Sequence, residues 1–267
     1  MALAFIIWIL AATIVYIFVG KYWWFPPGIN EHAATYDQHF QSTLLVTGVI
    51  FFLAQLALGW VIIRYRDRGQ KATYSHGNNK LELLWTSAAA VLFIGAVLAS
   101  TSTFAGVHLA PPPENAMQVE VLGKQFAWSF RYPGPDGKYG RTDIKFINDA
   151  NGNPFGLDDA DPASRDDIVT SALRVPVKTP VRLALKSRDV IHNFFVRELR
   201  LKQDLVPGLV IPLHFQADKI GTYEVPCSEL CGLGHHQMRT TLEVLSAEDF
   251  RKWEQEELAK LRQLYQQ

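Results

Sequence analysis

Three long stretches without a charged residue lie within the first 107 residues, and they constrain the fold more than any other feature of this sequence. They run over 2–20, 42–63 and 83–107. A helix needs about 20 apolar residues to cross the hydrocarbon layer of a bilayer. The stretches therefore predict three transmembrane helices, over about 2–24, 40–64 and 82–107. The first stretch is also short enough for a secretory signal, but it lacks a basic start and a clear small-x-small cleavage site, which favours a retained helix.

The charges between the stretches predict the orientation of the helices. Between the second and third stretches stand the basic residues Arg64, Arg66, Arg68, Lys71 and Lys80, with only Asp67 and Glu82 against them. The segment 21–41, in contrast, holds one Lys, one Glu and one Asp. Cytoplasmic loops carry an excess of Lys and Arg. The loop after the second helix is therefore predicted to be cytoplasmic, and the chain beyond residue 107 to lie on the outer side.

The polar part of the chain, 108–245, has the pattern of a β-domain. Short apolar or alternating runs, separated by Gly, Pro, Asn and Asp, predict strands over 118–122, 126–132, 182–185, 194–196, 210–215 and 240–244, and a further strand that ends at Pro226. This spacing is typical of a Greek-key β-sandwich. We expect the Asp-rich stretch 133–169 to be a surface insertion, and 246–267 to be an amphipathic helix with a capping box at its start. The fold class is thus an α + β membrane protein with a β-sandwich head and a C-terminal helix.

The charge balance and the absence of several motifs exclude whole classes of function. Lys and Arg number 26 and Asp and Glu number 26, so the chain has no basic surplus with which to bind nucleic acid. The sequence contains no P-loop, no dinucleotide fingerprint and no serine-nucleophile elbow. No motif for those kinds of catalysis or cofactor binding is present.

Metal-ligating side chains are concentrated in one loop. Residues 227–238 include Cys227, Cys231, His235, His236 and Met238. Soft sulfur and borderline nitrogen donors together select copper or zinc over a hard cation. A Cys227–Cys231 disulfide and a structural zinc site of two Cys and two His are the simpler alternatives. A zinc site has no use for Met238, although a Met can also serve for packing alone.

An upstream fragment, Asp189-Val-Ile-His192-Asn-Phe, supplies a further ligand. A lone His at the edge of an aromatic strand is more often structural, but read with the loop it completes a set for two copper ions. In that arrangement Cys227 and Cys231 bridge the ions, and His192 and His235 each bind one of them. Met238 and the main-chain carbonyl of Glu229 add weak axial contacts. Such a centre has no vacant position for a substrate, so we expect it to transfer electrons and to perform no bond chemistry.

These motifs resemble subunit II of the haem–copper cytochrome c oxidases. The resemblance is carried by C-S-E-L-C-G-x-x-H-x-x-M from Cys227, D-V-I-H-N-F from Asp189, K-Q-D-L-V-P-G over Lys202–Gly208 and the preceding membrane helices. It implies a cupredoxin-like head with a binuclear copper A centre, whose ligands fall on His192, Cys227, Glu229 through its carbonyl, Cys231, His235 and Met238. His236 matches no ligand position.

The resemblance also implies partners and a location. It implies that subunit I carries the haems and copper B, that subunit III is present, and that a magnesium ion is shared with subunit I through the Glu229 carboxylate. It implies a multi-pass protein of the bacterial inner (plasma) membrane with the copper domain on the periplasmic side. In Lys80-Leu-Glu82-Leu-Leu-Trp85-Thr86, Glu82 matches the family residue at the cytoplasmic mouth of a proton channel, although an acid that caps a helix at the interface is commoner.

The position at which the family accepts electrons from cytochrome c differs in this chain. The segment Gln125-Phe126-Ala-Trp128-Ser-Phe-Arg-Tyr has Phe126 where the family usually has Trp, and alternation would place its four aromatic rings on one strand face. Phe126 and Trp128 are the candidate residues through which electrons enter. Arg197 and Arg200 would repel a basic soluble cytochrome c, and the acidic stretch 158–167 is either a docking site or a solvated surface. These departures favour, as the donor, a cytochrome c domain of an associated quinol:cytochrome c oxidoreductase, with a soluble cytochrome c as the alternative.

Three alternatives to the oxidase reading remain. A quinol-oxidase version of the subunit would lack the metal, which the complete ligand set disfavours. A protein of the nitrous-oxide-reductase type would need a propeller domain, for which the chain has no room. A membrane-tethered module with a disulfide, or a copper chaperone, would differ from the oxidase subunit in copper content.

Overall fold

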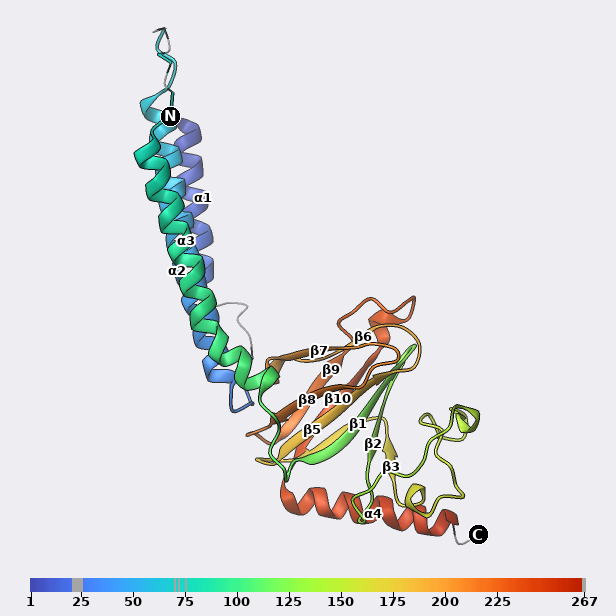
Figure 1. Cartoon of the computed structure of the whole chain (residues 1–267). Helices are drawn as coiled ribbons and strands as arrows, with labels where there is room; N and C mark the ends of the chain where they lie inside the picture. Colours follow the sequence, from blue (N-terminus) through green and yellow to red (C-terminus); the bar gives the residue numbers. More distant parts are fainter. Residues whose placement is uncertain (21–25, 70, 72, 75, 266–267) are drawn as a thin grey trace. The chain divides into compact units, whose positions relative to one another are not determined.

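The computed structural model describes residues 1–20, 26–69, 71, 73–74 and 76–265 (Figure 1). The chain divides into two compact units. One comprises Met1–Phe25 and Ala34–Gly106, and the other comprises Pro26–Ala33 and Val107–Gln267. We call the second unit the head.

The first unit contains three helices, α1 (Ala2–Val19), α2 (Ala33–Arg64) and α3 (Asn79–Phe104). All three are long and apolar enough to span a membrane, as predicted. Helix α2 begins well before residue 40 because the apolar stretch marks the membrane-crossing part of a helix and not its full length. The predicted end of the first helix, residues 21–24, lies outside the described residues.

Helix α1 packs against α2 through one aromatic side chain. The indole Nε1 of Trp8 donates a hydrogen bond to the carbonyl of Gln55, at 3.2 Å. A Cβ atom at Gly59 would lie 2.3 Å from that nitrogen, so only glycine leaves room for the ring. Ala4 and Ala11 are buried as well.

The head is a β-sandwich of mixed sheets (Figure 1). A five-stranded sheet has the order β3-β2-β1-β5-β8, and opposite it lie a three-stranded sheet, β4-β10-β9, and the β6-β7 pair. The strands are β1 (Met117–Lys124), β2 (Ala127–Tyr132), β3 (Ile168–Thr170), β4 (Leu173–Pro176), β5 (Pro180–Ser187), β6 (His192–Val196), β7 (Leu201–Leu205), β8 (Ile211–Gln216), β9 (Gly221–Pro226) and β10 (Arg239–Leu245). A bridge between Phe194 and Cys227 links β6 to the end of β9.

The predicted strands are all present, with one correction. Strand β2 begins at Ala127, so Phe126 lies in the turn between β1 and β2 and not on the strand face with the other rings. Trp128, Phe130 and Tyr132 alternate along β2 and are buried. Inward-facing residues from both sheets form the core, among them Val119, Val121, Leu183, Leu185, Phe194, Val225 and Leu242.

The insertion between β2 and β3 is irregular, as expected, with 3₁₀ turns at Ile144–Phe146 and Pro162–Ser164. It ends before residue 169 because Ile168 already pairs with Tyr132. Its base is held by Arg131, which is buried and donates to Glu120 at 3.1 Å and to Asp167. Loss of one partner from a buried ion pair costs about 3–5 kcal/mol, so this cluster fixes the base of the insertion.

The C-terminal helix α4 (Ala247–Tyr265) packs on the head through Phe250 and Leu258. The hydroxyl of Ser246 accepts a hydrogen bond from the N–H of Asp249, at 3.0 Å, and caps the helix as predicted. In Figure 1 α4 lies at the lower end of the head, away from the loop that follows β9. Residues 266–267 lie outside the described part of the chain.

The connection between α1 and α2 contributes residues 26–33 to the head. The N–H of Ile29 donates to the carbonyl of Glu198 at 2.9 Å, and the N–H of Asp218 donates to the carbonyl of Ile29 at 2.7 Å. The side chain of Asn30 is buried and donates to the carbonyl of Leu199 at 3.1 Å. This segment is therefore an integral part of the head.

Candidate metal centre

The loop 227–238 connects β9 to β10 at the upper end of the head in Figure 1. Its two ends are joined, because the N–H of Cys227 donates to the carbonyl of Met238 at 2.9 Å. The N–H of Ser228 donates to the carbonyl of Asn193 at 3.1 Å, which places the loop against β6. These hydrogen bonds place the loop next to His192, the first residue of β6.

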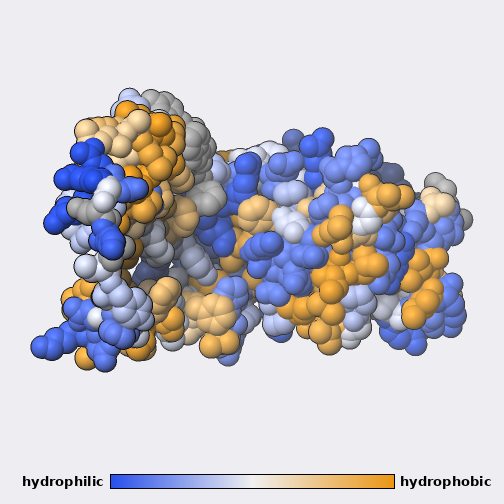
Figure 2. Space-filling view, turned by 90° about the horizontal axis from the view of Figure 1, so that it is seen from above, coloured by the Kyte–Doolittle hydropathy of each residue, from blue (hydrophilic) through white to orange (hydrophobic). Residues whose placement is uncertain are grey.

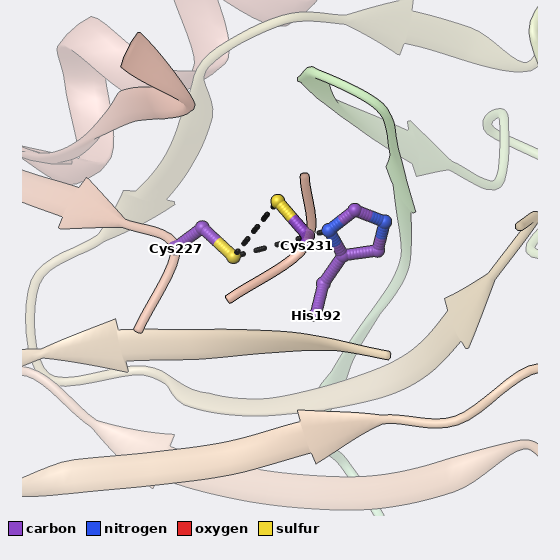
Figure 3. A group of neighbouring side chains, drawn as sticks. All are labelled: His192, Cys227 and Cys231. Carbon is purple, nitrogen blue, oxygen red and sulfur yellow. Dashed lines mark hydrogen bonds between the residues drawn. The ribbon is translucent and has the colours of Figure 1, made fainter. Parts of the chain in front are cut away.

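His192, Cys227 and Cys231 form a buried cluster in which all the ligand atoms lie within 4.8 Å of one another (Figure 3). The Sγ of Cys227 is 3.8 Å from Nδ1 of His192 and 3.9 Å from Sγ of Cys231. Both cysteines are free thiols. The cluster joins an imidazole from β6 to two sulfurs from a loop 35 positions later in the sequence.

The other three predicted ligands lie beside this pair of sulfurs. The Nδ1 of His235 is 3.5 Å from Sγ of Cys231, and the buried Sδ of Met238 is 3.8 Å from the same sulfur. The carbonyl oxygen of Glu229 is 3.2 Å from Sγ of Cys227, while its carboxylate side is exposed. The structure therefore brings all six sequence-predicted donors together, and His236 remains exposed outside the cluster.

These separations suit metal binding. Ligands at about 2.3 Å from a tetrahedral ion lie about 3.8 Å from one another, and the sulfur–sulfur and sulfur–nitrogen distances here run from 3.5 to 3.9 Å. Among the described residues, the mutually close group stops at His192, Cys227 and Cys231 and does not extend to His235. The four Cys and His donors therefore do not converge on a single point, as one tetrahedral zinc ion would require.

Asp189 orients the ring of His192. Its Oδ1 atom is 2.8 Å from Nε2, so the ring is held with Nδ1 toward Cys227. Burial lowers the pKa of His192, but the contacts with Cys227 and Asp189 outweigh burial and raise that pKa overall. A carboxylate behind a histidine fixes its tautomer and increases its strength as a ligand. Asp189 was not predicted from the sequence as a site residue, although its position three residues before His192 could have indicated that it contacts that side chain.

The two thiols are electrostatically different. Burial would raise the pKa of Cys227, but the hydrogen bonds from His192 and from the N–H groups near it lower that pKa overall. Burial, followed by the charge of the neighbouring sulfur, raises the pKa of Cys231. The site thus favours one thiolate and holds the second proton until a cation compensates the charge, because a metal binds the deprotonated form.

The candidate residues for electron transfer lie on two sides of the cluster. The ring of Trp128 is buried, with its centroid 6.2 Å from that of His192. Phe126 is 39% exposed and covers Gly232 and Gly234 of the loop. Figure 2, which looks down on this end of the head, shows hydrophobic residues exposed among hydrophilic ones. Leu230 and Leu233 of the loop are among the exposed hydrophobic side chains.

The charged residues named in the sequence analysis lie outside the metal cluster. Arg200 lies beyond the far end of β6 from His192 and donates to the carbonyl of Pro26. In the stretch 158–167, Asp158 pairs with Arg141 and Asp167 is buried against Arg131, while Asp159 and most of the other residues are exposed or half-buried. Glu82 is exposed in the first turn of α3, whose N-cap is Asn78.

Comparison with known proteins identifies close relatives. Residues 117–245 match the family "Cytochrome C oxidase subunit II, periplasmic domain". The chain is 35% identical over 256 residues to the alternative cytochrome c oxidase subunit 2 of Bradyrhizobium diazoefficiens, covering 95% of this chain and 91% of that protein. It is 30% identical over 312 residues to cytochrome c oxidase subunit 2 of Thermostichus vulcanus, covering 95% and 86%. The crystal structure of the periplasmic domain of subunit II of a Bradyrhizobium japonicum cytochrome oxidase is 27% identical, with a TM-score of 0.42, and covers 57% of this chain and 99% of that one.

Proposed function

The chain belongs to the cytochrome c oxidase subunit II family, and from that premise we propose that its head holds a binuclear copper A centre that accepts electrons from a cytochrome c. The electrons then pass to the haems of subunit I, where oxygen is reduced to water and protons are translocated. This chain transfers electrons and does not itself reduce oxygen. Two copper ions in the cluster would supply a one-electron redox couple.

One observation carries this proposal: two neighbouring sulfurs each have an imidazole beside them. His192 lies beside Cys227 and His235 beside Cys231, with the two sulfurs 3.9 Å apart between them. This arrangement supports two ions that share both sulfurs. Met238 supports copper over zinc, since a thioether is a soft ligand. Asp189 keeps His192 in place, so the ligands need to move little when the charge of the centre changes.

Electrons are proposed to enter at Phe126, with Trp128 behind it. Phe126 is the candidate that solvent reaches, and Trp128 contacts the ring edge of His192. We propose that the donor is a cytochrome c, or a cytochrome c domain of an associated quinol:cytochrome c oxidoreductase, that docks on this end of the head. The exposed Leu230 and Leu233 favour an apolar contact there over a strongly charged one.

The remaining assignments depend on other subunits. Subunit I would complete the magnesium site to which Glu229 contributes its exposed carboxylate, and subunit III would complete the complex. Glu82 is proposed to mark the mouth of the proton channel, which requires that it face the cytoplasm. The apolar helices and the family's periplasmic domain make this a membrane protein with a periplasmic head. We place it in a bacterial inner membrane.

The experiment that tests the copper assignment is electron paramagnetic resonance of the full chain, purified with its oxidase partners. We expect one unpaired electron with hyperfine splitting from two equivalent copper nuclei, and loss of that signal in Cys231→Ser. A splitting from a single copper nucleus would reject the binuclear centre. Absence of copper with a Cys227–Cys231 disulfide would instead support a binding module, and a single labile copper would support a chaperone.

A further inference from the structure

We infer that Gln125 is a positioning residue for the metal centre, which holds the segment carrying Cys231 at a fixed place relative to His192. The inference rests on the proposed copper function. Gln125 and Phe126 form the turn between β1 and β2, and neither residue is a candidate ligand. This turn nevertheless contacts both chain segments that carry ligands.

The first contact runs to the histidine side of the centre. The main-chain N–H of Gln125 donates to Oδ2 of Asp189 at 2.7 Å. The other carboxylate oxygen of Asp189 binds Nε2 of His192 at 2.8 Å. Just before the turn, the carbonyl of Gly123 accepts from the N–H of Arg188 at 3.0 Å. The turn and the segment 188–192 are therefore held together at two points.

The second contact runs to the cysteine side. The side-chain amide of Gln125 donates to the main-chain carbonyl of Cys231. The carbonyl and the Sγ atom belong to the same residue, so a bond that fixes the carbonyl also restricts where the sulfur can lie. The bond therefore depends on the length of this side chain and on the N–H donor at its end.

The third contact is steric and lies in the next residues of the loop. A Cβ atom at Gly234 would lie 2.4 Å from Cδ2 of Phe126, and one at Gly232 would lie 2.8 Å from Nε2 of Gln125. Gly232 also has a φ of +137°, which side chains other than glycine's rarely adopt. The two glycines thus allow the loop to lie directly on the turn.

Together these contacts form a continuous path from His192 through Asp189 and Gln125 to Cys231. The path joins β6 to the loop without passing through a metal ion. Because Phe126 is the proposed point of electron acceptance, the same turn that meets the donor also sets the ligand geometry. We therefore expect Gln125 to affect the electronic structure of the centre while contributing no ligand.

The test compares two variants of Gln125 with a matched control in the purified oxidase. Gln125→Met keeps the side-chain length and removes the donor, and Gln125→Ala removes the whole side chain. Gln118→Ala is the control, because Gln118 lies on β1, the strand that leads into this turn, and also donates to a main-chain carbonyl, that of Ala116 at 2.9 Å. We measure copper content, the hyperfine coupling and visible bands of the centre, its midpoint potential, and the rate of copper release to a chelator.

Both Gln125 variants should retain two coppers in the head but show altered hyperfine coupling and a shifted potential. Loss of one hydrogen bond should speed release of copper about fivefold. Gln118→Ala should match the unsubstituted protein. Spectra, potentials and release rates unchanged in both Gln125 variants would overturn the inference. So would failure of both variants to assemble while Gln118→Ala assembles, since that would show a general structural role. Failure of the copper proposal itself is distinguishable, because the unsubstituted protein would then lack the two-nucleus signal.

Discussion

A histidine in a β-strand is ordinarily a structural residue, and His192 differs because its neighbours define one orientation of its ring. Asp189 binds Nε2, Cys227 faces Nδ1, and Gly123 on β1 leaves the space that the ring fills. None of these neighbours is adjacent to His192 in sequence. The orientation of its ring therefore depends on Asp189 of its own segment and on two distant segments, the end of β1 and the loop 227–238.

Gly123→Ala should disturb the centre without removing a ligand. A Cβ atom there would lie 3.0 Å from Cδ2 of His192 and 3.2 Å from Cδ2 of Leu205. The ring cannot withdraw without breaking its bond to Asp189, so we expect a changed copper spectrum and a loss of about 1–3 kcal/mol in stability. Copper spectroscopy and thermal unfolding of the purified complex measure the two effects. An unchanged spectrum would mean that His192 can move without consequence.

Met238→Leu tests whether Met238 acts as an axial ligand or only packs in the core. The side chain is 1% exposed, and leucine has a similar volume, so the loss of unfolding free energy should be below about 1.5 kcal/mol. The copper content should persist, because the four Cys and His donors remain, while the midpoint potential and visible bands shift with loss of the thioether. Potentiometry with optical detection provides the measurement. Identical potentials in the two proteins would show that Met238 only packs.

The six candidate ligands could be named from the sequence because their chemical types are unusual and five of them are closely spaced, and the structure brings all six together. Asp189 and Gln125 were not predicted as site residues, since carboxylates and amides are common and have many roles. What distinguishes them is a contact between segments about 64 to 106 positions apart. Such contacts follow from strand register, which local sequence patterns do not specify.

At the scale of elements, the insertion between β2 and β3 is fastened to the metal-binding end of the head. Asp149 pairs with Arg188 at 2.8 Å and with Lys124 at 2.5 Å. Arg188 immediately precedes Asp189, and Lys124 immediately precedes Gln125. The composition of the insertion predicted its irregular, exposed course, but not this attachment, because an Asp-rich stretch gives no indication of which of its carboxylates finds a partner.

Asp149→Asn should destabilise the head in a pH-dependent manner. Hydrogen bonds from Arg188 and Lys124 lower the pKa of Asp149 to about 2, so the folded state binds its proton more weakly than the unfolded chain does. The pairs therefore contribute stability above about pH 4, and this contribution is lost as the pH falls through about 2. The side chain is 40% exposed, so solvent screening limits the effect to about 1 kcal/mol.

Thermal unfolding at several pH values measures this effect. At pH 7 the variant should melt about 2–4 °C below the unsubstituted protein, and the difference should shrink as the pH is lowered below 4. Asp136→Asn is the control, since this exposed carboxylate of the same insertion accepts a hydrogen bond from the N–H of Lys138. If the melting temperatures of Asp149→Asn and the unsubstituted protein differed by the same amount at every pH, the assigned role of Asp149 would be contradicted.

At the scale of the whole molecule, the segment 26–33 connects the membrane topology to the head. It precedes α2 and is hydrogen-bonded within the head through Ile29 and Asn30. The head follows α3, so two membrane-spanning helices separate two parts of one folded unit. An even number of crossings returns the chain to the same side, which agrees with the orientation predicted from the Arg-rich loop. The charge pattern alone predicted on which side of the membrane the head lies. That segment 26–33 is hydrogen-bonded into the head could be seen only in the structure.

Three epitope tags in separate versions of the chain test this topology together with retention of the first helix. A tag at the C-terminus should be removed by protease added to spheroplasts, because the head lies outside. A tag between Arg66 and His76 should be protected in spheroplasts and removed in inverted vesicles, because that loop is cytoplasmic. A tag before Met1 should remain on the mature chain and be protected like the loop tag, since a third crossing places the N-terminus inside. Loss of the N-terminal tag would mean that the first helix is cleaved, despite the packing of Trp8 on Gly59. If the loop tag and the C-terminal tag were equally accessible to protease, the chain could not cross the membrane twice between segment 26–33 and the rest of the head.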